Sequence, residues 1–279
     1  MKKLLYTLKM ALILGGRHQS FLGARWVPFM VRHSPAAWKR AIALRLLALS
    51  PHYFYRSARP EYKTMKTRQF LEAECERNWA SRRLICERIL GPYLDAATIA
   101  LDVGCGPGWL ARYVRERTKL VYACDISEGV LECAKVLNPA DNLVYFLAGD
   151  GTFPAVPDNS VDLAYSFAVV QHVTDEVFGG ILDGVYPKLK AGGRCVFHIV
   201  LSDAKGWRSE SEWRAGAGIY GKIKRHYGLN CFCREQESVM ATILAGHFVN
   251  PKVVKVRDLI PEPFDDIADQ HLVVFEKPR

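Results

Sequence analysis

The chain has 279 residues, a hydrophobic content of 49% and a formal net charge of +9. This length suits one sizeable globular domain with an appendage, and the composition excludes an intrinsically disordered chain. The eight cysteines are scattered through apolar segments rather than set out as a secreted disulfide framework. We therefore expect reduced thiols and a cytoplasmic location.

The positive charge is concentrated at the N-terminus. Residues 1–60 hold eleven lysines and arginines and no acidic residue, whereas residues 96–279 hold twenty basic and twenty-three acidic residues. The apolar run over residues 4–14 is interrupted by Lys9 and is too short to span a bilayer. The overall charge is therefore a property of the first segment alone.

We expect residues 1–67 to form a basic, apolar, helical extension. One of its helices is predicted to begin with Ser34 as its N-cap and Pro35 in its first turn, and to end near Leu49. Three roles stay open for the extension: a cap packed on the rest of the chain, a segment that binds a membrane surface through residues 1–60, and an organelle presequence. A recognisable nucleic-acid module is missing, so we expect no DNA partner.

The rest of the chain, residues 68–279, reads as one α/β domain. A helix is predicted over residues 68–90, and apolar strands then alternate with helices up to residue 200. This alternation is typical of a doubly wound, mostly parallel sheet. Toward the C-terminus we expect a helix over residues 236–245 and two further strands over residues 252–256 and 271–276.

A glycine-rich turn follows the first of these strands. Gly104, Gly106 and Gly108 have the spacing G-x-G-x-G, which differs from the G-x-G-x-x-G of dinucleotide-binding folds. A strand, a glycine turn and a helix start form a nucleotide-binding corner. Asp102 lies two residues before the first glycine, where its charge would repel a pyrophosphate but suit a cationic ligand. Asp125 ends the next strand, at the position that binds ribose hydroxyls.

These motifs resemble those of the class I S-adenosylmethionine-dependent methyltransferases, and the resemblance covers about residues 68 to 279. Four further landmarks follow the glycine turn in the order and at the intervals of that family: residues 124–127, 147–151, 158–173 and 186–194. The resemblance implies a seven-stranded Rossmann-like sheet whose last strand is antiparallel. It also implies S-adenosylmethionine as the cofactor.

The resemblance assigns cofactor contacts residue by residue. Asp102 and the glycine turn would hold the methionine end, and Asp125 with Ile126 the ribose side. Asp150 and Gly151 would lie at the adenine, and Phe167 would line the pocket near the methionine carboxylate. Asp150 and Gly151 also fit plain turn chemistry.

Two histidines lie near the ends of predicted strands: His172 follows the fourth strand, and His198 lies within the fifth. His172 lies where the transferred methyl group is expected, so it is our candidate for a general base; the alternative is that it caps the next helix. His198 lies in an apolar run and is interpreted as a core residue. Cys231 and Cys233 have no second ligand pair at metal-binding spacing, so we expect no metal.

The expected function is methyl transfer to a small-molecule acceptor, for which an amphiphilic or lipid-linked compound fits the basic, aromatic N-terminus. The alternatives are a methyltransferase acting on protein or RNA, a non-catalytic S-adenosylmethionine-binding subunit, and a nicotinamide dehydrogenase, which the glycine spacing and Asp102 disfavour. An irregular insert at residues 201–232 is interpreted as a lid over the acceptor. The sequence does not indicate an oligomeric state.

Overall fold

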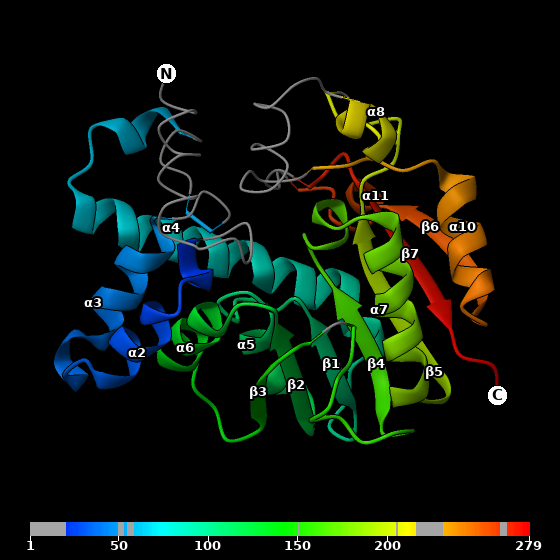
Figure 1. The fold of residues 1–279 in the computed structure, drawn as a ribbon, viewed down its shortest axis with the longest axis horizontal. Helices are drawn as coiled ribbons and strands as arrows, with labels where there is room; N and C mark the ends of the chain where they lie inside the picture. The colour runs from blue at the N-terminus through cyan, green and yellow to red at the C-terminus, as the bar shows by residue number, and fades with distance from the viewer. Residues whose placement is uncertain are drawn as a thin grey trace.

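The computed structural model describes residues 21–49, 53–54, 59–149, 151–204, 206–215, 231–262 and 267–279. Its centre is a seven-stranded sheet in the order β3-β2-β1-β4-β5-β7-β6 (Figure 1). The strands are β1 (Ile99–Val103), β2 (Leu120–Asp125), β3 (Leu143–Leu147), β4 (Val161–Ser166), β5 (Leu189–Ile199), β6 (Val249–Lys255) and β7 (His271–Glu276). β7 runs antiparallel to both of its neighbours, β5 and β6, and the other paired strands are parallel to each other. The predicted doubly wound, mostly parallel sheet is confirmed.

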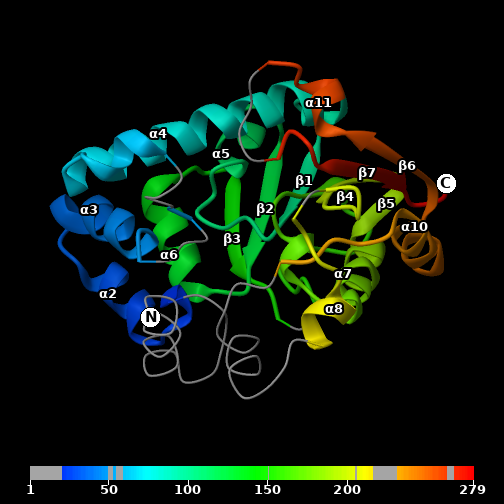
Figure 2. The same ribbon diagram turned by 90° about the horizontal axis from the view of Figure 1, so that it is seen from above.

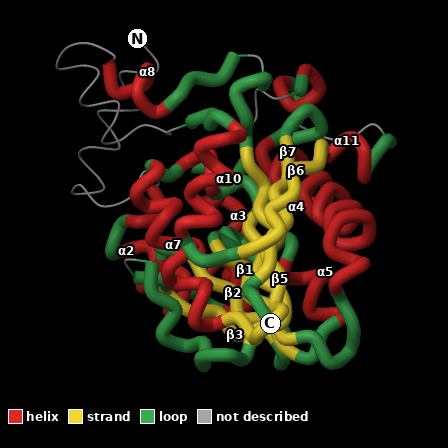
Figure 3. Tube along the Cα trace, turned by 90° about the vertical axis from the view of Figure 1, so that its right-hand side faces the viewer, coloured by secondary structure: helices red, strands yellow, loops and turns green. Residues whose placement is uncertain are grey.

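Helices flank this sheet. The described α-helices are α2 (Trp26–His33), α3 (Ala36–Leu47), α4 (Thr67–Leu84), α5 (Ala111–Val114), α6 (Glu128–Leu137), α7 (Asp175–Lys188), α8 (Glu210–Ala215), α10 (Gln236–Ala245) and α11 (Val256–Leu259). Shorter helical turns are η1 (Phe21–Gly23), η2 (Pro60–Lys63), η3 (Ile85–Leu90), η4 (Gly91–Tyr93), η5 (Arg115–Arg117) and η6 (Val170–His172). Figure 3 shows the sheet nearly edge-on, with helices on both of its sides.

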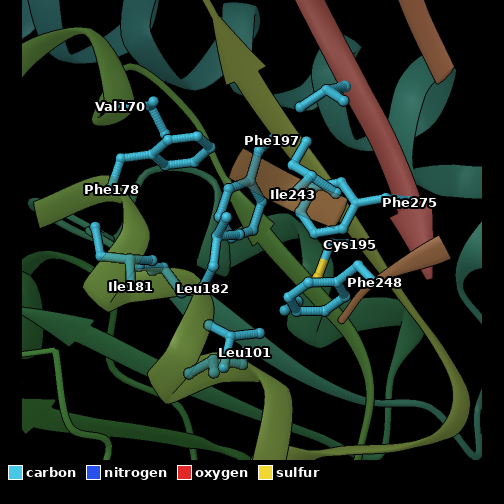
Figure 4. Close-up of a cluster of buried hydrophobic side chains, with 14 of the residues drawn as sticks. Leu101, Val170, Phe178, Ile181, Leu182, Cys195, Phe197, Ile243, Phe248 and Phe275 are labelled. Carbon is cyan, nitrogen blue, oxygen red and sulfur yellow. The ribbon is translucent and has the colours of Figure 1, made fainter. Parts of the chain in front are cut away.

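One buried cluster joins the sheet to α7 and α10. Phe178, Ile181 and Leu182 of α7 point toward Phe197 of β5, and Phe275 of β7 closes the same cluster (Figure 4). Phe197 and Phe275 lie on this face of the sheet because successive residues of a strand face opposite sides. A second cluster on the other face buries η3, α5 and α11 against the same sheet. The sheet is therefore covered on both faces, which a parallel sheet requires.

The strand order reverses between β1 and β4, and in open α/β sheets such a reversal leaves a crevice outside the carboxyl ends of the two strands. The chain leaves β1 toward β2 on one side, whereas it leaves β4 toward β5 on the other side. Ligands of open α/β sheets bind outside the carboxyl ends of the strands at such a reversal. The glycine turn follows β1 and the segment containing Phe167 follows β4, so both face this crevice.

The N-terminal extension lies beside the β2–β3 half of the sheet. Its helices α2 and α3 pack on α6 (Figure 2), and they form a third buried cluster with α4 and α6. The prediction of Ser34 as the N-cap of α3 is wrong: its hydroxyl donates to the Met30 carbonyl at the end of α2, and α3 begins after Pro35. The predicted run over residues 4–14 lies outside the described residues.

Most other predicted elements are present with shifted ends. The helix predicted over residues 68–90 is α4 followed by a π-helical turn, and the chain leaves it at Gly91–Pro92 as expected. The helix after the glycine turn begins only at Ala111, because residues 108–110 still belong to the turn. Within the described ranges, no helix has the length and hydropathy needed to cross a membrane.

A close backbone contact positions α7. A Cβ atom on Gly184 would lie 1.8 Å from the carbonyl oxygen of Gly151, whereas a Cβ on Gly179 of the same helix would meet nothing within 4 Å. We expect Gly184→Ala to lower the free energy of unfolding by about 1–3 kcal/mol through overpacking. Urea denaturation followed by circular dichroism measures this loss.

Gly179→Ala is the matched control, because it makes the same change in the same helix. It should raise stability by up to about 1 kcal/mol through helix propensity. Equal effects of the two substitutions would contradict the contact between α7 and the turn at Gly151.

Candidate cofactor site

The glycine turn folds back onto the end of β2. The backbone amides of Gly104 and Cys105 both donate to the carbonyl of Cys124, at 2.9 and 2.8 Å. Gly104 has φ of +78°, and a Cβ there would lie 2.3 Å from the Val169 side chain, so only glycine fits. The side-chain amide of Asn138, at the end of α6, donates to the carbonyl of Pro107 at 2.7 Å. The turn is thus held from three sides.

Asp102 is a buried carboxyl group with one oxygen left unsatisfied among the described residues. Its side chain is 2% exposed, and its Oδ2 atom accepts no hydrogen bond from the residues that the structure describes. Burial raises the pKa of Asp102 to about 8, and the nearby Tyr165 hydroxyl opposes the rise. A buried acceptor of this kind is costly unless a ligand satisfies it, and a cationic ligand would do so best.

Asp125 is joined to the glycine turn directly. Its Oδ2 accepts from the Gly106 amide at 3.1 Å, and its Oδ1 accepts from the Ser127 amide at 2.9 Å. Burial raises the pKa of Asp125 to about 6, although these two bonds lower it. The next side chain, Ile126, is 58% exposed and offers an apolar surface at the same edge of the sheet. The structure therefore brings Asp102, Asp125 and the predicted glycines together.

The opposite wall of the crevice comes from the end of β4. Phe167 is 9% exposed and lies parallel to the ring of His198, with centroids 6.1 Å apart. The Nδ1 atom of His198 accepts from the Ala168 amide at 3.2 Å. Burial lowers the pKa of His198 to about 3. His198 is therefore a buried neutral residue, as interpreted from the sequence.

The predicted adenine-side residues are described in part. Asp150 lies outside the described residues. Gly151 has φ of +75°, and a Cβ there would lie 2.9 Å from the carbonyl of Gly180 in α7. The close approach to α7 is reason enough for a glycine at this position, and contact of either residue with adenine stays a prediction.

His172 ends the turn η6 and is half-buried. Its Nδ1 atom lies 3.7 Å from the Cys231 Sγ atom. It does not cap α7, because the Thr174 hydroxyl accepts from the Val177 amide in that role. Among the described residues, no three His, Cys, Asp or Glu side chains gather as a metal site. The predicted role of His172 as a base stays a prediction.

Two residues near the site were missed from the sequence. Tyr53 of the extension lies against Gly106, since a Cβ on that glycine would be 3.3 Å from Tyr53 Cε1. The positive charge of Arg82 on α4 lowers the pKa of both Asp102 and His198, so it acts on both walls of the crevice. Neither residue belongs to a motif, and nothing in the sequence around either one indicates that it lies near the glycine turn.

The raised pKa of Asp102 has a consequence for stability. Because this pKa is about 8 in the folded chain and 3.8 for the ordinary side chain, the folded state binds the extra proton between these values. The stability of the ligand-free protein should therefore fall as the pH rises through this window. Asp102→Asn should make the protein more stable than the wild type at pH 9, on the order of 2–4 kcal/mol, and have little effect at pH 4. Denaturation curves at a series of pH values measure this difference.

Asp141→Asn provides the control, since Asp141 is exposed and the substitution makes the same change of charge. It should not alter the pH dependence. An Asp102→Asn protein with the wild-type pH dependence would contradict the burial of this carboxyl group.

Known proteins resemble this chain in sequence. Residues 101–197 match the sequence model of a methyltransferase domain. The chain is 34% identical over 124 residues to a malonyl-[acyl-carrier protein] O-methyltransferase of Serratia marcescens, a match that covers 44% of this chain and 47% of that protein. It is 32% identical over 129 residues to a trans-aconitate 2-methyltransferase of Rhizobium rhizogenes, covering 45% and 46%. The matches thus span about half the length of these relatives.

The fold is also found in solved structures. The phosphoethanolamine N-methyltransferase 2 of Haemonchus contortus, in complex with S-adenosyl-L-methionine, superposes with a TM-score of 0.50 at 17% identity, over 78% of this chain and 61% of that one. At this identity the likeness concerns the fold. Residues 101–197 thus match a methyltransferase domain, in agreement with the resemblance to the class I S-adenosylmethionine-dependent methyltransferases that the motifs indicate.

Proposed function

We propose that this protein transfers the methyl group of S-adenosylmethionine to a carboxylate of a small-molecule acceptor. The observation that carries the cofactor assignment is the pair of buried aspartates at one glycine turn. The unmatched Oδ2 of Asp102 suits the positively charged methionine end of the cofactor, and Asp125 suits two ribose hydroxyls. The guanidinium of Arg82 supplies a cation for the cofactor carboxylate.

The choice of a carboxylate acceptor rests on whether the reaction needs a general base. S-adenosylmethionine supplies a methyl group on an excellent leaving group, so the protein must mainly align the acceptor and exclude water. A carboxylate is ionised at neutral pH and needs no general base. This suits a site in which His198 is buried with a pKa near 3 and His172 contacts Cys231. The malonyl and aconitate groups in the names of the two relatives are carboxylates as well.

A second acceptor class would use His172 differently. A hydroxyl acceptor has a high pKa and would need this histidine as a base. The insert at residues 201–232 is proposed to close over either acceptor, and its Lys222, Lys224 and Arg225 suit an anionic compound. These three residues lie outside the described ones, so their support comes from the sequence.

The test uses S-adenosylmethionine with a labelled methyl group and a panel of acceptors. Small di- and tricarboxylates and a carrier-bound malonyl thioester are compared with phenols and amines. We expect a methyl ester as product, whose label is released as volatile methanol by mild base. His172→Gln should keep this activity within about threefold, because no proton has to be removed.

Two results would oppose the proposal. A base-stable label would indicate an ether, amine or carbon acceptor, and loss of activity in His172→Gln would favour the hydroxyl acceptor.

As the control for cofactor binding, Asp125→Ala should weaken calorimetric binding of S-adenosylhomocysteine about 10- to 100-fold, because it removes hydrogen bonds to a charged group.

We further propose that the extension binds anionic membrane surfaces. Phe29 of α2 and Trp38 of α3 are 65% and 66% exposed, and Trp26 is 43% exposed. Residues 21–49 contain arginines, a lysine and no acidic residue. Aromatic rings beside basic side chains suit the interface of an anionic bilayer. A lipid-linked or amphiphilic acceptor would then meet the enzyme at that surface.

Cosedimentation with vesicles tests this docking. The wild type should bind vesicles that contain phosphatidylserine, and the binding should weaken in high salt. The double variant Phe29→Ser, Trp38→Ser should lose most of the binding. Leu244→Ser is the matched control, because Leu244 is 53% exposed on α10, away from the extension. Equal binding by both variants, or none by the wild type, would contradict the proposal.

A further inference from the structure

The extension reaches the cofactor site through Tyr53. A Cβ atom on Gly106 would lie 3.3 Å from Tyr53 Cε1 and 3.9 Å from Tyr53 Cδ1, so the ring lies directly against the middle glycine of the turn. The amide of the same glycine donates to Asp125. Burial raises the pKa of the Tyr53 phenol, and so does the negative charge of Asp125. The tyrosine thus lies beside the carboxylate assigned to the ribose.

Aromatic packing holds the tyrosine in place. The next residue, Phe54, is 3% exposed and stacks on Trp109, with centroids 6.3 Å apart and planes 11° apart. It also meets Phe70 of α4 edge to face at 6.3 Å. Trp109 immediately follows the last glycine of the turn. Phe54 therefore anchors Tyr53 to the turn itself rather than to a distant surface.

The other end of the extension is clamped on α6. The carbonyl of Leu22 lies against Gly129, where a Cβ would be 2.2 Å from its oxygen. Arg32 of α2 forms ion pairs with Glu128 and Glu132 of α6. Helix α6 begins three residues after Asp125. Both attachment points of the extension thus belong to elements that shape the cofactor site.

From these contacts we infer that Tyr53 is a cofactor-binding residue and that the described part of the extension (α2 and α3 with Tyr53 and Phe54) acts as a strap over the bound cofactor. The inference rests on the proposed function and adds a residue to its site. The ring covers the hydrogen bonds between Asp125 and the ribose and excludes water from them, which strengthens them. A cofactor held in this way leaves the site only when the strap moves away from the glycine turn.

The experiment measures binding and release of S-adenosylhomocysteine by the full chain. Tyr53→Ala should weaken calorimetric affinity about tenfold, mostly through faster dissociation in stopped-flow displacement. Tyr53→Phe should stay within about threefold of the wild type, because the ring is kept. Gly129→Ala tests the strap at its distant end: it should also speed dissociation several-fold, although its Cβ is added on α6 and not at the binding residues. Gly179→Ala, which meets open space, should leave dissociation unchanged.

The outcomes separate the inference from the proposed function. If Asp125→Ala weakens binding but Tyr53→Ala does not, the site is correct and the strap is overturned. If Asp125→Ala leaves affinity unchanged, the proposed cofactor site itself is wrong. A cooperative thermal unfolding transition, measured for each variant, establishes whether that variant is folded. Faster dissociation in Gly129→Ala with an intact thermal transition supports the strap even if Tyr53→Ala does not fold.

Discussion

The burial of two carboxylates at the ends of β1 and β2 is the constraint on which the site depends. A buried polar group needs a partner, and among the described residues the glycine turn supplies the Gly106 amide to Asp125 but no donor to the Oδ2 atom of Asp102. The carboxyl group of Asp125 shapes the turn, whereas the Oδ2 atom of Asp102 is left for a ligand. The strand order places both at the crevice where α/β sheets bind ligands. One short turn therefore joins Asp125, which also holds the ribose in the proposed function, to Asp102, whose unmatched oxygen suits the methionine end.

Much of this could be predicted from the sequence because the information is local. The glycine spacing, Asp102 and Asp125 lie within twenty-four residues of one another, and each residue type matches a specific backbone or charge requirement. The strand at residues 271–276 and the helix at residues 236–245 were also predicted from their apolar patterns, whereas the antiparallel direction of that strand was implied by the family resemblance. Short-range chemistry of this kind does not depend on knowing which distant segments meet.

Contacts between distant segments could not be predicted in this way. Tyr53 precedes the glycine turn by about fifty residues, and its place against Gly106 depends on how α2 and α3 pack on α6. The error at Ser34 has a local cause: its hydroxyl can bond either forward as an N-cap or back to Met30, and the tight connection between two helices favours the second. The sequence pattern shows that a polar residue is there but not which bond it makes.

The third buried cluster contains residues of both the extension and the α/β domain. Leu22 and Leu47 of the extension share it with Cys133 of α6 and with Trp109 beside the glycine turn. A chain shortened to its family-matching part would lose one wall of this cluster and present Trp109 and a face of α6 to water. Exposed apolar surface of that size promotes aggregation. The part of the chain that is easiest to recognise by its motifs thus lacks the residues that cover Trp109 and this face of α6.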